Sequence, residues 1–315
     1  MGSNLVFALN ATIPLFILIA LGYFLKRVNI LTDGFLAAAN KFNFTITLPV
    51  LLFTDLASKN FKETFDLKFV LFCAGSTTIG FFGAWILTKL LMKDKNSVGE
   101  FVQACYRSST AVLGLALIQN IYGTTGMAGM MVLGAVPLYN VYAVIVLQTE
   151  SPINKKGEKN IQRALKGIIT NPILIGVILG LVASLINIKF PTIIDTSLNY
   201  VARIATPLAV ICIGGEFSFK NAFRSLKKSS LAAAVKLIIL PLVFVPIAIL
   251  MGFYTDKLVA ILVMLAGPTT PSCFIMAKQY GYEGTITSSC VVLTTLFSSV
   301  TLTLFIMILR SMGYI

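Results

Sequence analysis

The sequence predicts an all-α polytopic membrane protein with ten transmembrane helices, arranged as two inverted repeats of five helices each. Three observations lead to this fold class: the composition, the recurrence of long apolar runs, and an internal repeat. Of the 315 residues, 57% are hydrophobic and 12% are charged, whereas a soluble domain carries about 25% charged residues. The lipid bilayer is therefore the expected surroundings of most of the chain.

Charged and turn-forming residues separate ten apolar runs, each near the length of about 20 residues that crosses a bilayer. The first run, "NLVFALNATIPLFILIALGYFLKR", is too long for the core of a signal peptide and has no basic residue before it, so we expect it to be retained. The ten expected spans are 4–25, 35–57, 69–92, 101–121, 125–148, 165–188, 197–216, 230–252, 258–279 and 286–309.

The basic residues predict how these spans are oriented. Successive loops lie on alternate faces of the membrane. Counted together with the span ends beside them, the loops of one face carry fifteen Lys and Arg and those of the other carry six, and the remaining four lie inside spans. Since basic loops face the cytoplasm, we expect an integral protein of the plasma or inner membrane with both termini extracytoplasmic. The polar stretch 149–164 is then a cytoplasmic connecting loop.

The composition also excludes several classes of function. The net charge of +13 comes mostly from short loops between apolar runs, which fits membrane orientation better than a nucleic-acid partner. The five cysteines lack CxxC spacing and are expected to be reduced, buried thiols rather than disulfides or a metal site. Without histidine, a GxSxG motif or a glycine-rich phosphate loop, no enzyme, cofactor or metal is expected.

A shift of the chain by 158 residues aligns helix-disturbing landmarks with one another. It matches Pro14 with Pro172, Pro49 with Pro207, and the Tyr-Gly pair at 122–123 with the pair at 280–281. Five spans is an odd number, so two copies must enter the membrane from opposite sides. The predicted organisation is a first repeat at 1–148, the connecting loop at 149–164, and a second, inverted repeat at 165–315.

The stretch "AGPTTPSCFIMAKQYG" (266–281) places two prolines inside the ninth expected span. Each proline removes a backbone donor and disturbs the preceding turn. Its repeat partner, "SSTAVLGLALIQNIYG" (108–123), also begins with small and hydroxylated residues. Non-helical backbone at membrane depth is tolerated only where protein buries it or water reaches it. Two such breaks would meet near the midplane and offer free N–H groups to an anion. The alternative is that the prolines only kink a helix that packs against its neighbours.

Charged residues within the spans are the next candidates. Arg107 could neutralise a carboxylate, or its long side chain could reach the membrane interface, and Lys236 has the same two interpretations. Asp55 and Glu216 lie near span ends. Each carboxylate could be solvated at the membrane interface, or it could carry a proton that is coupled to transport. Asn120 could supply an oxygen ligand for Na⁺ beside the break, or an ordinary hydrogen bond between helices.

Five motifs carry a resemblance to a known family. They are "TLPVLLF" (47–53), "GLALIQNIYG" (114–123), "NPILIGVILGL" (171–181), "ATPLAVICIGG" (205–215) and "PTTPSCFIMAKQYG" (268–281). In this order and spacing they resemble the auxin efflux carrier family, which includes plant carriers and bacterial permeases for malate or malonate. The resemblance implies broken fourth and ninth spans that cross at the substrate site. It also implies a scaffold of spans 1, 2, 6 and 7, often dimeric, and a transport domain of spans 3–5 and 8–10 that moves like an elevator.

The chain departs from the family pattern at the breaks. Ser109 and Ala116 stand where the family usually has asparagine and proline, Ser272 replaces another asparagine, and Pro271 is additional. The substrate therefore need not be the one typical of the family.

The function expected from these patterns is secondary transport of a small organic anion, a carboxylate of the auxin or malate and malonate type. Coupling to H⁺ or Na⁺, or none, stays open, and so does a homodimer through the scaffold. A membrane sensor or receptor that retains the transporter fold is the alternative, although no appended domain is present to carry a signal. The expected substrate-binding residues are Asn43, Arg107, Ser109, Thr110, Gly114, Pro268, Thr269, Thr270, Pro271 and Ser272. The candidates for ion coupling are Asp55, Asn120, Glu216 and Lys236.

Overall fold

A computed structural model describes residues 2–58, 66–110, 118, 127–152, 170–217 and 219–315, and the regular structure in this part of the chain is entirely helical. Within it, six helical stretches are long and apolar enough to cross a membrane. They are Asp33–Ala57, Leu67–Leu91, Ala128–Thr149, Thr192–Glu216, Ser225–Leu250 and Thr285–Ser311. The prediction of a polytopic, helical membrane protein is therefore confirmed.

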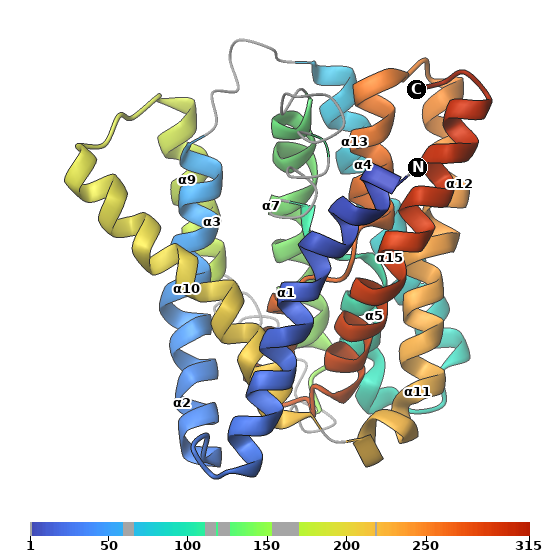
Figure 1. Ribbon diagram of the computed structural model, residues 1–315. Helices are drawn as coiled ribbons and strands as arrows, with labels where there is room; N and C mark the ends of the chain where they lie inside the picture. Colours follow the sequence, from blue (N-terminus) through green and yellow to red (C-terminus); the bar gives the residue numbers. More distant parts are fainter. Residues whose placement is uncertain (1, 59–65, 111–117, 119–126, 153–169, 218) are drawn as a thin grey trace.

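The described part of the first half runs from α1 to α7 (Figure 1). A π-helical turn, η1, joins α2 to α3, and a 3₁₀ turn, η2, precedes α5. The bounds are α1 Gly2–Arg27, α2 Asp33–Phe42, η1 Asn43–Thr47, α3 Leu48–Ala57, α4 Leu67–Leu91, η2 Lys95–Ser97, α5 Val98–Tyr106 and α7 Ala128–Thr149.

The second half has the predicted interruption in its ninth span and an earlier start of its eighth. The predicted span 258–279 is two helices, and α11 begins at Phe219, well before the predicted start at residue 230. The helix extends past the apolar run because lysine, alanine and leucine favour helix in water as well as in lipid. The bounds are α9 Pro172–Leu185, α10 Thr192–Glu216, α11 Phe219–Ala234, η4 Val235–Ile239, α12 Leu240–Leu250, α13 Thr255–Ala266, α14 Ser272–Gln279 and α15 Thr285–Ser311.

Local sequence explains where several of these elements begin. Asn171 caps α9, because its Oδ1 accepts hydrogen bonds from the N–H groups of Ile173 and Leu174, and Pro172 needs no partner at the first helical position. The two π-helical turns each precede a Leu-Pro pair that starts the next helix, at Pro49 and Pro241. Proline cannot donate to the preceding turn, so the helix widens there instead of breaking.

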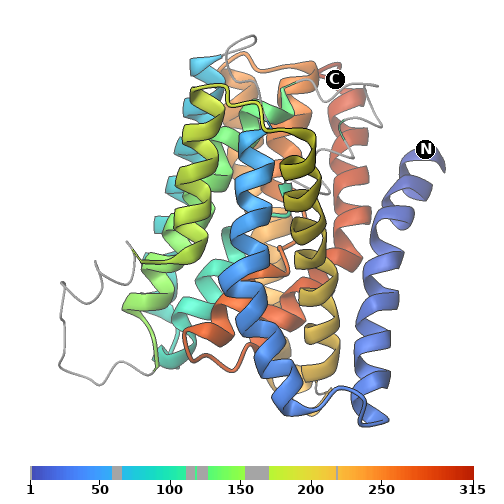
Figure 2. The same cartoon turned by 90° about the vertical axis from the view of Figure 1, so that its left-hand side faces the viewer.

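A first helix group consists of α1, α2–α3, α9 and α10, which pack through glycines. Figure 2 shows α2–α3 (blue) between α9 (yellow-green) and α10 (olive). A Cβ atom on Gly214 of α10 would lie 2.0 Å from the carbonyl oxygen of Ile19 in α1, and one on Gly176 of α9 would lie 2.4 Å from that of Pro49 in α3. The backbones are therefore in direct contact, as in membrane helix pairs that associate through small residues.

A second helix group consists of α4, α5, α7, α11–α13 and α15. Its core includes aromatic side chains: Phe81 of α4 stacks on Tyr142 of α7 at a centroid distance of 4.5 Å and packs edge-on against Tyr106 of α5. The short helix α14 contacts both groups, through α10 and α2 on one side and through α5 and α15 on the other.

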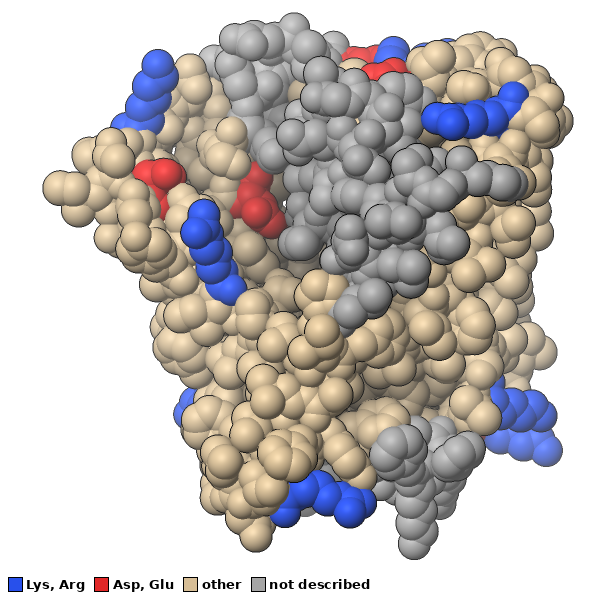
Figure 3. Space-filling view, viewed as in Figure 1, with Lys and Arg blue, Asp and Glu red and all other residues tan. Residues whose placement is uncertain are grey.

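The outer surface of the molecule is apolar. Leu90 of α4, Ile193 of α10 and Leu250 of α12 are largely exposed. On the face in Figure 3, Lys and Arg lie mainly toward the two ends, and a broad band of uncharged residues separates them. Such a band would face the hydrocarbon core of a bilayer. All five cysteines are free and buried, as the sequence predicted.

Candidate functional site

Two interruptions of helix lie side by side in the middle of the molecule. Helix α13 ends at Ala266 and α14 begins at Ser272, so residues 267–271 are not helical. Helix α5 ends at Tyr106, and the backbone of Arg107 is extended, with ψ of 137°. The N–H of Ser109 donates to the carbonyl oxygen of Pro268 at 2.9 Å, which joins the two non-helical segments directly.

Near the breaks, side chains form hydrogen bonds with backbone N–H and carbonyl groups that have no partner within a helix. The Thr269 hydroxyl donates to the carbonyl oxygen of Ala104 at 3.1 Å, and its N–H donates to the Thr294 hydroxyl at 2.9 Å. The Gln103 amide donates to the carbonyl oxygen of Cys273 at 2.9 Å. Since unpaired backbone groups are costly away from water, these bonds explain how irregular backbone persists among apolar helices.

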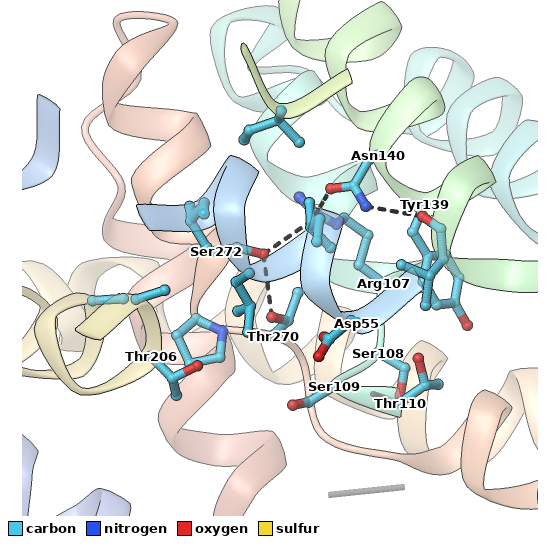
Figure 4. A pocket seen from close by; sticks show the side chains of 18 residues that line it. Asp55, Arg107, Ser108, Ser109, Thr110, Tyr139, Asn140, Thr206, Thr270 and Ser272 are labelled. Carbon is cyan, nitrogen blue, oxygen red and sulfur yellow. Dashed lines mark hydrogen bonds between the residues drawn. The ribbon is translucent and has the colours of Figure 1, made fainter. Parts of the chain in front are cut away.

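A cavity of about 60 Å³ lies beside the breaks, between the two helix groups (Figure 4). On the side of the first group, α3 presents residues at three- and four-residue spacing, which share one face of a helix. The lining residues are Leu48, Leu51, Leu52, Asp55, Arg107, Ser108, Ser109, Thr110, Val136, Tyr139, Asn140, Ile173, Ala205, Thr206, Ala209, Thr270, Pro271 and Ser272.

Arg107 supplies a buried positive charge in the wall of this cavity. The side chain is 2% exposed, so it does not extend to the membrane interface. Its Nη2 donates to Asn140 Oδ1 and to Ser272 Oγ, each at 3.0 Å, and its Nη1 contacts the sulfur of Met276 at 2.9 Å and Gln103 Oε1 at 3.4 Å. Figure 4 shows the Ser272 hydroxyl between the guanidinium and the Thr270 hydroxyl.

Several polar atoms in the cavity wall have hydrogen-bonding capacity that the protein leaves unused. Among the described residues, six buried side-chain polar atoms lack a partner, and three of these are Arg107 Nε, Ser108 Oγ and Thr110 Oγ1. Buried groups of this kind usually find a partner, and an unmet one costs about 1–3 kcal/mol. The wall of this cavity therefore has hydrogen-bonding capacity that a polar ligand could meet.

Lys236 lies behind the breaks rather than in the cavity wall. It is fully buried in η4, so interfacial solvation does not explain it. Its Nζ donates to the carbonyl oxygens of Tyr106, at 3.3 Å, and Met264, at 3.2 Å. These carbonyls belong to the carboxyl-terminal ends of α5 and α13, where the helix dipole is negative. The ammonium group therefore compensates two helix ends at once.

The two acidic candidates have different surroundings. Asp55 lines the cavity and is half-buried. Glu216, at the end of α10, accepts hydrogen bonds from Lys278 of α14 at 2.7 Å and from the Asn40 amide at 2.6 Å. Glu216 therefore joins α10 to α14 through an ion pair, away from the cavity.

The structure brings together six of the expected binding residues in the cavity wall: Arg107, Ser109, Thr110, Thr270, Pro271 and Ser272. Pro268 and Thr269 lie in the non-helical segment and bond to neighbouring backbone. Asn43 is fully buried but does not line the cavity, since its amide donates to the carbonyl oxygen of Ala205 at 2.9 Å and so joins η1 to α10. Gly114 and Asn120 lie outside the described residues.

Sequence reasoning missed Asn140, which holds the guanidinium of Arg107. A signal for it existed, because Asn140 is a single amide within the apolar run "VPLYNVYAVIV", and polar side chains inside a membrane span are functional candidates by default. Ser108 and Thr206 were also missed, and nothing in their sequence surroundings distinguishes them from other small polar residues.

Comparisons with known proteins place the chain among membrane transporters. A family model described as membrane transport protein matches residues 7–306. An uncharacterized transporter from Methanothermobacter thermautotrophicus is 22% identical over 95% of this chain and 98% of its own length. A Rhizobium meliloti protein named provisionally as a malonate transporter is 24% identical, with 95% of each chain covered. The uncharacterized transporter YfdV of Escherichia coli is 24% identical over 91% of this chain and 93% of its own.

These matches extend over nearly the whole chain, and the names indicate a transporter rather than an enzyme. The resemblance seen in the five sequence motifs is thereby confirmed. The chain belongs to the membrane transport protein family, the family of the auxin efflux carriers.

Proposed function

We propose that this protein is a secondary transporter that carries a small organic anion, and that the anion binds through a carboxylate in the cavity beside the two breaks. The observation that carries this proposal is the buried guanidinium of Arg107, with unpaired polar atoms of Arg107, Ser108 and Thr110 in the same wall. A carboxylate carries the charge opposite to that of the guanidinium and accepts hydrogen bonds from the unpaired donors, so it can meet both.

The amino-terminal end of α14 adds to the attraction. This helix begins at Ser272, in the cavity wall, and the start of a helix carries a partial positive charge. Arg107 and the helix end are fixed by packing and hydrogen bonds before an anion arrives. Little reorganisation is therefore needed when the anion binds, which favours affinity.

Transport requires the cavity to open to each side of the membrane in turn, and we propose an elevator motion for this step. The glycine-packed first group, spans 1, 2, 6 and 7 of the sequence analysis, acts as the scaffold, and spans 3–5 and 8–10 move against it. The position of the cavity supports this, because its walls come from both groups. Moving one wall relative to the other would expose the anion.

The proposed fold for this motion is ten spans in two inverted repeats, and the observed helices support the offset of 158 residues. Shifted by that amount, α4 falls on 225–249, within α11–α12, and α5 falls on 256–264, within α13. Helix α7 falls on 286–307, within α15. We propose both termini on the extracytoplasmic side, and a homodimer through the exposed apolar faces of α9 and α10.

Coupling depends on the direction of transport. Expelling a monoanion from a cell that is negative inside gains about 2.3 kcal/mol per 100 mV, so export needs no coupled ion. Import would need a proton, Na⁺ or exchange for another anion. Of the candidates for coupling, we propose Asp55 as the strongest within the described residues, because it lines the cavity, whereas Glu216 and Lys236 do not.

The test is uptake of radiolabelled carboxylates into proteoliposomes, with and without an imposed membrane potential. Replacing Arg107 by glutamine should weaken anion binding by about tenfold to a hundredfold, as expected for a lost charge-assisted hydrogen bond of about 1.5–3 kcal/mol. Arg203→Gln is the matched control, because Arg203 is exposed on α10. Equal affinity of the two variants would contradict the site, and binding without flux under any gradient would favour a sensor or receptor.

A further inference from the structure

The amine of Lys236 lies where two helices end, beside the breaks. Lys236 belongs to η4, and its side chain is 0% exposed. Its Nζ donates to the carbonyl oxygens of Tyr106, the last residue of α5, and of Met264, in the last turn of α13. The last four carbonyl groups of a helix have no donor within that helix, so the amine meets two acceptors that the helices leave open.

No acidic side chain accounts for this buried lysine. Within the parts of the chain that the structure describes, no carboxylate forms a hydrogen bond or an ion pair with Lys236. The thiols of Cys105, Cys273 and Cys290 are close enough to act on it electrostatically, but a protonated thiol carries no charge. A fully buried lysine is rare unless it is paired. The partner of this amine is therefore the backbone at two helix ends.

Carbonyl oxygens at the ends of interrupted helices are also the ligands that bind small cations at membrane depth. In secondary transporters, unwound backbone carbonyls and the carboxyl-terminal ends of half-helices coordinate Na⁺ or serve the coupling proton. The carboxyl-terminal end of a helix carries a partial negative charge, and two such ends converge on Lys236. The lysine head group is compact and has N–H groups for both oxygens in either protonation state.

This place is connected to the cavity through the backbone. The carbonyl group of Tyr106 belongs to the peptide bond that leads into Arg107. The carbonyl oxygen of Met264 also accepts from the Tyr139 hydroxyl at 3.2 Å, and both Tyr139 and Arg107 line the cavity. The group that holds these two carbonyls therefore helps to set the backbone from which the Arg107 guanidinium extends.

We propose that Lys236 occupies a monovalent-cation site, and that its amine takes the place of a bound Na⁺ ion. The amine joins the ends of α5 and α13, so Lys236 is a positioning residue for Arg107, and the anion site is assembled without Na⁺. The link to transport rests on the proposed function. Since the amine holds these oxygens, this place is closed to Na⁺ as a coupling ion.

The test asks whether Na⁺ can replace the amine. Lys236→Ala removes the amine and leaves room beside the carbonyl oxygens, so the purified full-length variant in lipid nanodiscs should bind Na⁺. Replacing choline chloride by about 100 mM NaCl at constant ionic strength should raise its unfolding temperature by at least about 3 °C, with saturation. The wild-type protein should show no such rise, because its amine already occupies the place.

Two further variants separate a cation site from a general effect of salt. Lys236→Met fills the space with apolar atoms, so its unfolding temperature should fall below that of the wild type and should not respond to Na⁺. Lys68→Ala is the matched control, because the exposed Lys68 also donates to a carbonyl oxygen at a helix end, that of Met251 at 2.6 Å. Water can replace this amine, so Lys68→Ala should not respond to Na⁺ either.

The outcomes separate this proposal from the proposed function, because the unfolding measurements need no anion. Lys236→Ser is a second small variant, and its hydroxyl adds an oxygen ligand. If both small variants fold without responding to Na⁺, if neither folds even in NaCl, or if the wild-type protein shows the same rise, Lys236 does not occupy a cation site. Absence of uptake for every carboxylate would contradict the proposed function, whereas the Na⁺ response would still decide the role of Lys236.

Discussion

At the scale of single residues, the position of Arg107 depends on a partner 33 residues away in the sequence. Asn140 Oδ1 accepts from the guanidinium at 3.0 Å, and the Asn140 amide donates to the carbonyl oxygen of Val136 at 2.9 Å. The second bond fixes the orientation of the amide, so the amide can fix the orientation of the arginine. Ser272 supplies the other anchor, also at 3.0 Å.

This arrangement predicts the effect of Asn140→Ala. Loss of the amide leaves Arg107 held by fewer hydrogen bonds and adds an unmet buried donor, at a cost of about 1–3 kcal/mol in the free energy of unfolding. Carboxylate affinity should fall by about tenfold, since about 1.4 kcal/mol corresponds to that factor. Thermal unfolding and equilibrium binding on the same preparation would measure both effects.

The control for this prediction is Asn199→Ala, because the Asn199 side chain bonds to Asp195 within its own helix. It should leave carboxylate affinity unchanged. An Asn140→Ala variant with wild-type affinity would mean that Ser272 alone is sufficient to position the arginine.

At the scale of helices, the interruption at 267–271 depends on Pro268 and Pro271, which cannot donate to a preceding turn. The residues around them are held by Thr269, which bonds to Ala104 and Thr294. The two prolines thus prevent a helix from running through, and the threonine bonds stabilise the alternative. Both features are needed, because proline within a membrane helix often produces only a kink.

Replacing Pro268 and Pro271 together by alanine should abolish transport while leaving folded protein in the membrane. The substitutions restore two backbone donors, so α13 and α14 can join into one helix and withdraw Thr270 and Ser272 from the cavity wall. Proteoliposome uptake and circular dichroism would measure the two effects, with a small gain of helix expected. Normal uptake by the double variant would contradict this account of the site.

Packing of α1 against α10 gives a second prediction for the helices. A Cβ atom on Gly214 would lie 2.0 Å from a backbone oxygen, which no side-chain movement can relieve, so Gly214→Ala should lower the free energy of unfolding by about 1–3 kcal/mol or more. Gly75 of α4 offers the matched control, since no neighbouring atom lies within 4 Å of the place that its Cβ atom would take. Gly75→Ala should be neutral or stabilise by up to about 1 kcal/mol through helix propensity.

Thermal unfolding in a fixed detergent would rank these two glycine variants against the wild-type protein. Equal unfolding temperatures for Gly214→Ala and the wild type would mean that α1 and α10 can separate without cost.

At the scale of the whole molecule, an ion pair joins the first helix group to α14, which also packs against the second group. Glu216 of α10 and Lys278 of α14 are 2.7 Å apart and only partly exposed. In the proposed elevator motion, α10 belongs to the scaffold and α14 to the moving part. The pair therefore stabilises the arrangement described above relative to any arrangement in which α14 has moved.

Glu216→Gln should reduce the population of this arrangement. A partly exposed pair contributes up to about 1 kcal/mol, which corresponds to a change of about fivefold in an equilibrium. Distances between spectroscopic labels on α10 and α14 would measure the shift. The exchanged variant, with Glu216→Lys and Lys278→Glu together, should restore the original distribution, and failure of the exchange to do so would assign the effect to packing.

Much of this organisation could be predicted from the sequence, and the rest could not for physical reasons. Pro268 and Pro271 indicated the break, because a missing N–H is a property of the residue itself. The direction of Arg107 was open, because a long side chain can point inward or toward the interface, and the choice depends on Asn140 in another helix. Asn43 likewise points away from the cavity because its amide binds the carbonyl oxygen of Ala205 in α10, a contact that the sequence alone does not reveal.

The contact of Lys236 with two carbonyl oxygens has a mechanical consequence. A single ammonium group connects η4 to the ends of α5 and α13, so these three elements meet at one fixed point deep in the molecule. None of them can slide along its axis without breaking these hydrogen bonds and leaving the buried Lys236 amine without a partner. Whatever rearrangement delivers a solute across the bilayer must therefore carry all three as one rigid piece.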